Sequence, residues 1–218
     1  RGHGRSAGRR AYVSAFEGLV PDAVSAIRWA RERCPDVPVF LLGHSMGGAL
    51  AALVAIEHGD LLDGLVLSAP SVKISEDVSP FLQKIAGVMG ALAPRLPAAD
   101  LDTTLVSRDP AVVAAYEADP LVYHGKILAR TGHQLLSTEQ SVLARAAELT
   151  RPFLVLHGSA DGLADPRGSA ELHAGASSAD KTHIVLDGLY HEILNEPEQA
   201  EVRQHILDWV LDRLQPRA

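Results

Sequence analysis

Short apolar runs alternate with longer amphipathic stretches along this chain. Four runs rich in Val, Leu and Ile end near Gly, Asp or Pro, over residues 37–43, 62–69, 153–158 and 183–187. Strands buried on both faces of a parallel sheet show such continuous apolar runs. The pattern therefore predicts an α/β fold with about four recognisable parallel strands, whose carboxyl ends share one edge.

Helical patterns fill the spaces between these runs. Residues 46–58 predict a helix that ends at Gly59 in a left-handed conformation. Residues 22–34 and 198–214 predict two amphipathic helices. Trp29 and Trp209 fall on the apolar stripes of these two helices, so both are predicted to be core residues.

The pattern changes after Ala69, where six prolines punctuate short helical pieces before a longer predicted helix at roughly 138–149. A segment of this length is too long for a plain loop. We expect residues 71–145 to form a helical cap over the carboxyl edge of the sheet. The cap would be inserted into one core made of residues 1–70 and 146–218.

Length and composition narrow the classes of function. At 218 residues and 47% hydrophobic content, the chain can bury the core of one large domain. A formal net charge of −7 offers no electrostatic basis for binding nucleic acid. The basic stretch of Arg1, Arg5, Arg9 and Arg10 is interpreted as a solvated loop.

Cysteine usage and hydropathy add two expectations. Cys34 is the only cysteine, which excludes an internal disulfide and a cysteine-based zinc site. The sequence contains no signal-peptide pattern and no apolar run long enough to span a membrane. We therefore expect a soluble protein in the cytoplasm or at the periphery of a membrane.

Residues 43–47, Gly-His-Ser-Met-Gly, match the pattern G-x-S-x-G. The spacing alone is weak, but here it follows a predicted strand and opens a predicted helix. In that setting a strained turn presents the Ser45 hydroxyl at the sheet edge, and the flanking glycines are expected to avoid Cβ clashes. The backbone N–H of Met46 can then donate to a developing oxyanion. A plain glycine turn is the alternative.

A serine nucleophile needs a base within hydrogen-bonding reach and a third group that orients the base. Asp161 lies just beyond the run 153–158, and His191 lies just beyond the run 183–187. We therefore predict a triad of Ser45 as nucleophile, Asp161 as acid and His191 as base.

Three other residues compete for these roles. Asp165 is the rival acid, but it lies four residues further along the same loop. His44 and His157 flank the active edge; His44 is interpreted as packing beside the nucleophile, and His157 as a strand-end residue. The rival assignments stay open at this point.

Other chemistries find less support. The chain contains no P-loop sequence and no H-E-x-x-H zinc signature, so neither a metal nor an organic cofactor is expected. Residues 2–7 fit a relaxed dinucleotide-binding pattern, but no strand precedes them. Epoxide hydrolases and dehalogenases would ordinarily place an aspartate at the position of Ser45.

Several segments together resemble the monoacylglycerol lipases of the α/β-hydrolase superfamily, of the serine aminopeptidase S33 or hydrolase-4 type. They are RGHGRS at the start, GHSMGG, HGSAD and GLYHEILNEPE around the triad, and SRDPAVVAAYEADPLVYHG over residues 107–125. The resemblance covers nearly the whole chain. It implies an α/β-hydrolase fold and the hydrolysis of monoacylglycerols or similar short- to medium-chain acyl esters through an acyl-enzyme on Ser45. Amidase and thioesterase chemistry, which use the same triad, stay open.

The resemblance also concerns the substrate and the membrane. It implies that Tyr116 lines the pocket for the alcohol. Phe81 and Met89 belong to an apolar set at roughly helical spacing, part of which is expected to line an acyl channel or to face a lipid surface. Packing of the cap onto the core is the alternative explanation for this set.

One departure from the resembled family concerns the N-terminus. In relatives the RGHGRS loop follows the fourth strand, so this chain is expected to lack the first strands and an early HG loop that donates the second oxyanion N–H. Loss of one such donor typically costs about 10²- to 10³-fold in rate. The run 37–43 would become a bare sheet edge, from which we expect a homodimer or limited solubility. The alternative function is a weak or inactive truncated hydrolase that binds lipid or partners.

Overall fold

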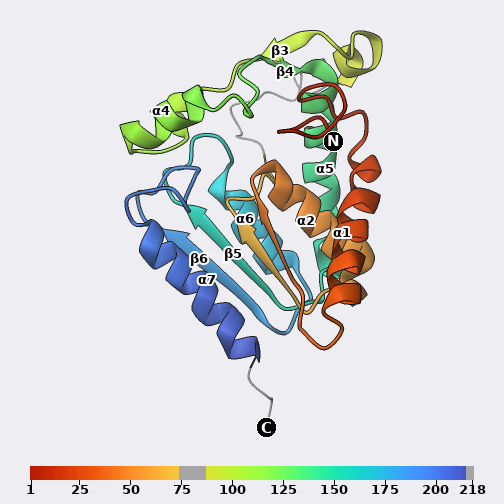
Figure 1. Ribbon diagram of the computed structural model, residues 1–218, viewed down its shortest axis with the longest axis vertical. Coiled ribbons are helices and arrows are strands. Elements are labelled where there is room, and N and C mark those ends of the chain that lie inside the picture. Colours follow the sequence, from red (N-terminus) through yellow and green to blue (C-terminus); the bar gives the residue numbers. More distant parts are fainter. Residues whose placement is uncertain (74–86, 215–218) are drawn as a thin grey trace.

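The computed structural model describes residues 1–73 and 87–214. Its centre is a four-stranded sheet in the order β1-β2-β5-β6, in which every neighbouring pair is parallel (Figure 1). The strands are β1 (Phe40–His44), β2 (Gly64–Ser68), β5 (Phe153–Gly158) and β6 (Lys181–Leu186). All four predicted strands are confirmed, although β1 begins three residues later than predicted, after Pro38, which has no N–H to donate.

Helices cover both faces of the sheet. The strand residues alternate between two hydrophobic clusters: Leu65 and Val155 face one cluster, and Val66 and Leu154 face the other. The first cluster is covered by four helices, which are α1 (Val20–Arg33), α2 (Met46–His58), α5 (Ala129–Ala144) and α6 (Pro166–Gly175). The second cluster is covered by α7 (Gln199–Leu214), which lies alone across that face in Figure 1. This two-sided arrangement explains why the strands read as continuous apolar runs.

The helix α2 has the bounds that the sequence predicts, but its end differs. Gly59 has a φ of −59°, which is right-handed, and it begins the 3-10 turn η2 (Gly59–Leu61). The left-handed stop predicted at Gly59 is therefore wrong. Within α2 seven residues are buried because the helix is enclosed between the sheet and the neighbouring helices α1 and α5.

The two tryptophans have different surroundings. Trp209 on α7 is buried and packs its ring edge-on against Phe40 at 6.0 Å. Trp29 on α1 is 58% exposed, with the Arg33 guanidinium 4.7 Å from its ring centroid. The core prediction is confirmed for Trp209 and wrong for Trp29. The buried residues of α1 include Ile27, and Trp29 lies two positions later, about 200° further around the helix.

The chain between β2 and β5 contains most of the irregular structure. Its described elements are β3 (Pro97–Ala99), η3 (Thr103–Leu105), α4 (Pro110–Ala118), β4 (Ile127–Leu128), α5 and η4 (Ala146–Glu148), and residues 87–92 are also helical. The antiparallel pair β3-β4 and the helix α4 lie beyond the carboxyl ends of the sheet strands (Figure 1). A further 3-10 turn, η1 (Phe16–Gly18), precedes α1.

The helix α5 begins at Ala129, well before the predicted start near residue 138. Its first turns contain Gly132 and several polar residues, which hide the helical pattern in the sequence. The helix is stabilised by packing against α2, and Val142 belongs to the core cluster. Over residues 1–73 and 87–214, no helix combines the length and the apolar character that crossing a membrane requires.

Candidate active site

The turn between β1 and α2 holds Ser45 in a strained conformation. Ser45 has φ 52° and ψ −122°, in the left-handed half of conformational space that residues other than glycine rarely adopt. Two of its backbone hydrogen bonds tie it to the neighbouring strand and the loop after that strand: Ser45 N donates to Ser68 O at 3.1 Å, and Ser71 N donates to Ser45 O at 3.0 Å. The neighbouring strand β2 and its following loop therefore fix the turn that the motif predicts.

Glycines make room for this turn, but not at both predicted positions. A Cβ at Gly43 would lie 2.4 Å from Gly47 O, and a Cβ at Gly48 would lie 2.7 Å from Pro70 Cβ. A Cβ at Gly47 would meet nothing within 4 Å. The steric requirement is therefore confirmed at Gly43, whereas on the helix side it falls on Gly48 and not on Gly47.

The three residues of the predicted triad lie in one hydrogen-bonded line. Ser45 Oγ is 2.8 Å from His191 Nε2, and His191 Nδ1 is 2.7 Å from Asp161 Oδ2. Asp161 lies in the loop after β5 and His191 in the loop after β6. The two loops approach closely at Gly158, where a Cβ would lie 2.2 Å from Leu189 O.

The Asp161 carboxylate is buried and fully hydrogen-bonded. Its Oδ1 accepts from the backbone N–H groups of Leu163 at 2.8 Å and Ala164 at 3.0 Å. Burial by itself would raise the pKa of Asp161, but the hydrogen bonds from His157 and His191 outweigh it and hold the pKa below its ordinary value. Asp161 is therefore an anion that can orient His191 and stabilise its protonated form.

The rival acid Asp165 caps a helix instead of contacting the triad histidine. It caps the start of α6 by accepting from Arg167 N at 2.9 Å, and it forms an ion pair with the Arg167 side chain at 2.6 Å. The geometry thus brings Asp161, and not Asp165, to His191.

Two further polar residues lie beside the triad: His157, which the sequence indicates only as a strand-end residue, and Glu139, which the sequence does not single out. His157 Nε2 lies 3.0 Å from Asp161 Oδ2, so His157 is more than a strand-end residue. Buried Glu139 on α5 accepts a 2.6 Å hydrogen bond from Ser71 Oγ, beside the Ser45 turn. The position of His157 in HGSAD, at the end of a strand and four residues before the acid, is a signal that could have indicated its contact. Glu139 has no such signal, because its partner is 68 residues away in the sequence.

His44 packs beside the nucleophile, as predicted. Its ring centroid lies 4.9 Å from that of His191, and its Nδ1 is 3.0 Å from Ser68 O. Its Nε2 lies 3.2 Å from the Glu192 carboxylate. Burial would raise the pKa of Glu192, but the nearby His44 and His191 hold it below its ordinary value. A second carboxylate therefore lies close to the imidazole of the triad.

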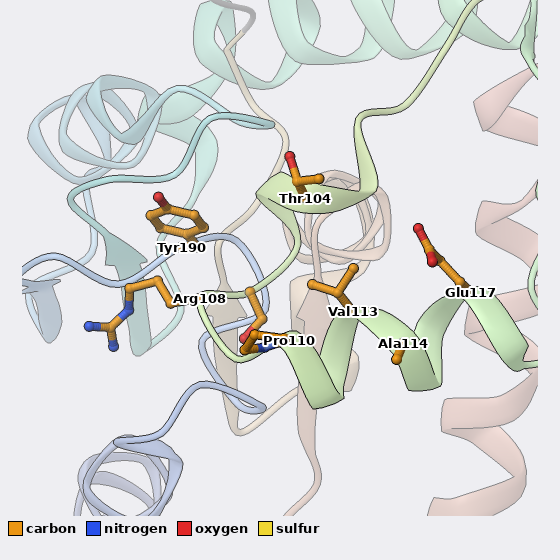
Figure 2. Close-up of a pocket in the computed structure, with 8 residues that line it drawn as sticks. Thr104, Arg108, Pro110, Val113, Ala114, Glu117 and Tyr190 are labelled. Carbon is orange, nitrogen blue, oxygen red and sulfur yellow. The ribbon is translucent and has the colours of Figure 1, made fainter.

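A cavity of about 460 Å³ opens next to the loop that carries His191 (Figure 2). The loop contributes Tyr190, and the η3–α4 segment contributes the other lining residues: Thr104, Ser107, Arg108, Pro110, Val113, Ala114 and Glu117. Figure 2 shows the Tyr190 ring on one side of this space and the Val113 face of α4 on the other. The cavity thus combines an apolar helix face with a polar rim.

The predicted substrate contacts fall in three places. Tyr116 lines a smaller cavity of about 80 Å³ with His124, whose ring centroid is 6.0 Å away. Burial raises the pKa of Tyr116, and the negative charge of Glu192 adds to this rise. Met89 is partly buried within the helical residues 87–92, and Phe81 lies outside the described residues. In the described ranges, no three His, Cys, Asp or Glu side chains group in a way that could hold a metal ion.

A parallel sheet covered by helices on both faces, with a strained serine between the edge strand and the next helix, defines the α/β-hydrolase class. The family model Hydrolase_4, described as serine aminopeptidase, S33, matches residues 1–198, and the chain belongs to this family.

Individual relatives agree with this assignment. The chain is 42% identical over 214 residues to a monoacylglycerol lipase of Mycolicibacterium smegmatis, a match covering 98% of this chain and 76% of the relative. It is 38% identical to the human monoglyceride lipase, over 97% of this chain and 71% of the relative. The crystal structure of the Paleococcus ferrophilus monoacylglycerol lipase superposes with a TM-score of 0.87 at 31% identity, covering 97% of this chain and 80% of that structure.

These relationships and the fold show a serine ester hydrolase that acts on carboxylic esters. The chain is shorter than these relatives. The alternative of an inactive hydrolase gains no support from them.

Proposed function

We propose that this protein hydrolyses monoacylglycerols or similar short- to medium-chain acyl esters through an acyl-enzyme on Ser45. The hydrogen-bonded line from Ser45 through His191 to Asp161 is the observation that carries the proposal. The names of the relatives support the class of substrate, since they are monoacylglycerol and monoglyceride lipases.

The reaction follows from the positions of these atoms. Ser45 Oγ attacks the ester carbonyl carbon while His191 Nε2 accepts the hydroxyl proton, and Asp161 stabilises the resulting imidazolium. The carbonyl oxygen becomes an oxyanion, to which the N–H of Met46 in the first turn of α2 donates. His191 then returns the proton to the leaving alcohol oxygen as the C–O bond breaks. A water then attacks the acyl carbonyl carbon while His191 accepts its proton, and His191 passes that proton to Ser45 Oγ as the bond between Oγ and the acyl group breaks and the fatty acid leaves.

The segment of residues 71–145 serves in this proposal as the cap that selects the substrate. Tyr116 contacts the alcohol part of the ester, which its place in the lining of the smaller cavity supports. Met89 and Phe81 contact the acyl chain. The cap also touches the lipid surface transiently, through exposed apolar residues such as Leu92, which is 81% exposed, and Val88.

The outer strand of the sheet supports a further part of the proposal, the association of two copies of this chain. Among the described strands β1 is an outer strand, and Leu42 on it is largely exposed. We expect two copies to pair through this edge. Light scattering after size-exclusion chromatography should give the mass of a dimer, and a clean monomer at high protein concentration would contradict the pairing.

The hydrolysis of p-nitrophenyl esters of increasing chain length, and then of monoacylglycerols, tests the proposal. Ser45→Ala should abolish turnover and labelling by a fluorophosphonate probe without changing the unfolding temperature, because the small hydroxyl is only partly buried. Ser25→Ala is the matched control, since Ser25 lies exposed on α1 and its hydroxyl donates to Pro21 O in the same helix. Turnover by Ser45→Ala near the wild-type rate would refute the mechanism. Ser45-dependent turnover of p-nitrophenyl esters without any hydrolysis of monoacylglycerols would refute the substrate class alone.

A further inference from the structure

The buried imidazole of His157 forms a contact that the proposed reaction does not yet use. His157 lies in β5 with its side chain fully buried. Its Nε2 is 3.0 Å from Asp161 Oδ2, and its Nδ1 is 2.7 Å from Ser169 Oγ on α6. The triad is therefore the end of a longer chain of contacts, from Ser169 through His157 to Asp161.

The direction of every hydrogen bond in this chain follows from the charge of Asp161. An ionised carboxylate can only accept, so the ring nitrogen of His157 that faces it, Nε2, must carry a proton. In the neutral ring Nδ1 is then an acceptor, and the Ser169 hydroxyl donates to it. The same rule makes His191 Nδ1 a donor to Asp161, which leaves His191 Nε2 free to accept the proton of the nucleophile. One consistent set of protons satisfies all the groups.

These contacts also restrict how the carboxylate can move. Asp161 Oδ1 is held by two backbone N–H groups, and Asp161 Oδ2 accepts from both His157 and His191. Without His157, the Oδ2 atom would have one donor, and a buried anion would lose part of the hydrogen bonding that compensates for its lost hydration. The carboxylate would then be free to tilt away from His191 Nδ1.

We propose that His157 is a positioning residue for the ester hydrolysis, which holds Asp161 ionised and aimed at His191, and that Ser169 keeps His157 in the required tautomer. The inference rests on the catalytic role proposed above for Asp161. A structural role alone, as a satisfied polar residue of the core, would affect stability but not the turnover of folded molecules.

Three variants separate the two roles. His157→Leu removes the donor and keeps an apolar side chain in the core. His157→Gln is the matched control, because its side-chain amide can place an N–H group near the position of Nε2. Ser169→Ala removes only the partner of Nδ1. For each variant, kcat and KM for a p-nitrophenyl ester are measured per active site titrated with a fluorophosphonate, together with the unfolding temperature.

We expect His157→Leu to lower kcat by about 10- to 100-fold at nearly unchanged KM, since one hydrogen bond to a buried charge is lost. His157→Gln should recover most of this loss, and Ser169→Ala should lower kcat by roughly two- to tenfold. If folded His157→Leu turns over at the wild-type kcat, or if His157→Gln is no better than His157→Leu, the positioning role is wrong. If His157→Leu does not fold, Ser169→Ala decides, and an unchanged kcat in that variant overturns the proposal. Failure of the proposed function is recognised separately, since wild-type turnover would then not depend on Ser45.

Discussion

The carboxyl edge of the sheet and the segment above it are built in opposite ways. At the edge, the side chains of Asp161, His157 and His191 are buried, and each has partners within 3.0 Å. In the segment above it, α4 and β3 contain no buried residue. The edge therefore fixes the reacting groups, while α4 and β3 leave their side chains at least partly exposed. The comparison predicts that changes at the edge affect kcat, whereas changes in the segment affect the choice of substrate.

The largest effect is expected at the centre of the edge. Asp161→Asn should lower kcat by on the order of 10³- to 10⁴-fold, because an amide can donate to His191 Nδ1 and so favour the wrong tautomer of the ring. Steady-state kinetics with a p-nitrophenyl ester checks this. Asp165→Asn is the control: the amide oxygen can still accept from Arg167 N and cap α6, the charge of the ion pair with Arg167 is lost, and both kcat and the unfolding temperature should change little. The reverse pattern would transfer the acid role to Asp165.

The buried carboxylate of Glu196 links the two regions. Glu196 accepts hydrogen bonds from Ser107 Oγ, from Arg108 N at 2.7 Å and from the Arg108 guanidinium. Burial by itself would raise the pKa of Glu196, but these contacts outweigh burial and lower the pKa. Glu196→Ala should reduce the free energy of unfolding by roughly 2–4 kcal/mol, because it leaves these donors without their acceptor. Urea denaturation measures the loss. Glu198→Ala, at the more exposed partner of Arg108, should cost less than about 1 kcal/mol, and equal losses would contradict this account.

A smaller, pH-dependent effect is expected at Glu139, beneath the Ser45 turn. Burial raises the pKa of Glu139 from 4.5 to about 7, against the hydrogen bond from Ser71, which lowers it. A pKa raised on folding means that the native state holds the proton more tightly, so this contribution to stability is present below pH 4.5 and is lost as the pH rises to about 7. Glu139→Gln keeps an acceptor for Ser71 and should gain roughly 2–3 kcal/mol over the wild type between pH 5 and pH 8.

Chemical denaturation of both proteins across this pH range tests the prediction for Glu139. Glu17→Gln, at an exposed position in η1, is the control that should follow the wild type. If the curves of Glu139→Gln and the wild type stay parallel, Glu139 does not change its protonation in this range.

The contrast between the two regions also explains what the sequence could predict. The strands, the Ser45 turn and the triad follow from local patterns, since each catalytic residue lies just after a recognisable apolar run. His157 and Glu139 were missed as functional neighbours because Ser169 and Ser71 reach them only through the fold. The same holds for the early start of α5, where Thr131 and Gln134 accept hydrogen bonds from Val13 N and Phe16 N, both 118 residues away in the sequence. Contacts between residues far apart in the sequence are not encoded in any local pattern. The features that depend on such contacts are the ones that the sequence does not predict.

The smallest effect is expected for a variant in the segment above the sheet, Tyr116→Ala. Tyr116→Ala should raise KM for monoacylglycerols by about three- to tenfold, because one aromatic contact with the alcohol is lost, and should leave kcat for p-nitrophenyl acetate nearly unchanged. Tyr12→Ala, at a partly buried tyrosine that lines a different cavity, is the matched control. Competition between a monoacylglycerol and a simple alkyl ester of the same fatty acid measures the preference directly. If Tyr116→Ala instead lowers kcat equally for every ester, Tyr116 contributes to the reaction itself, as the residues of the sheet edge do. The division between a region that carries out the chemistry and a region that selects the substrate then fails at this residue.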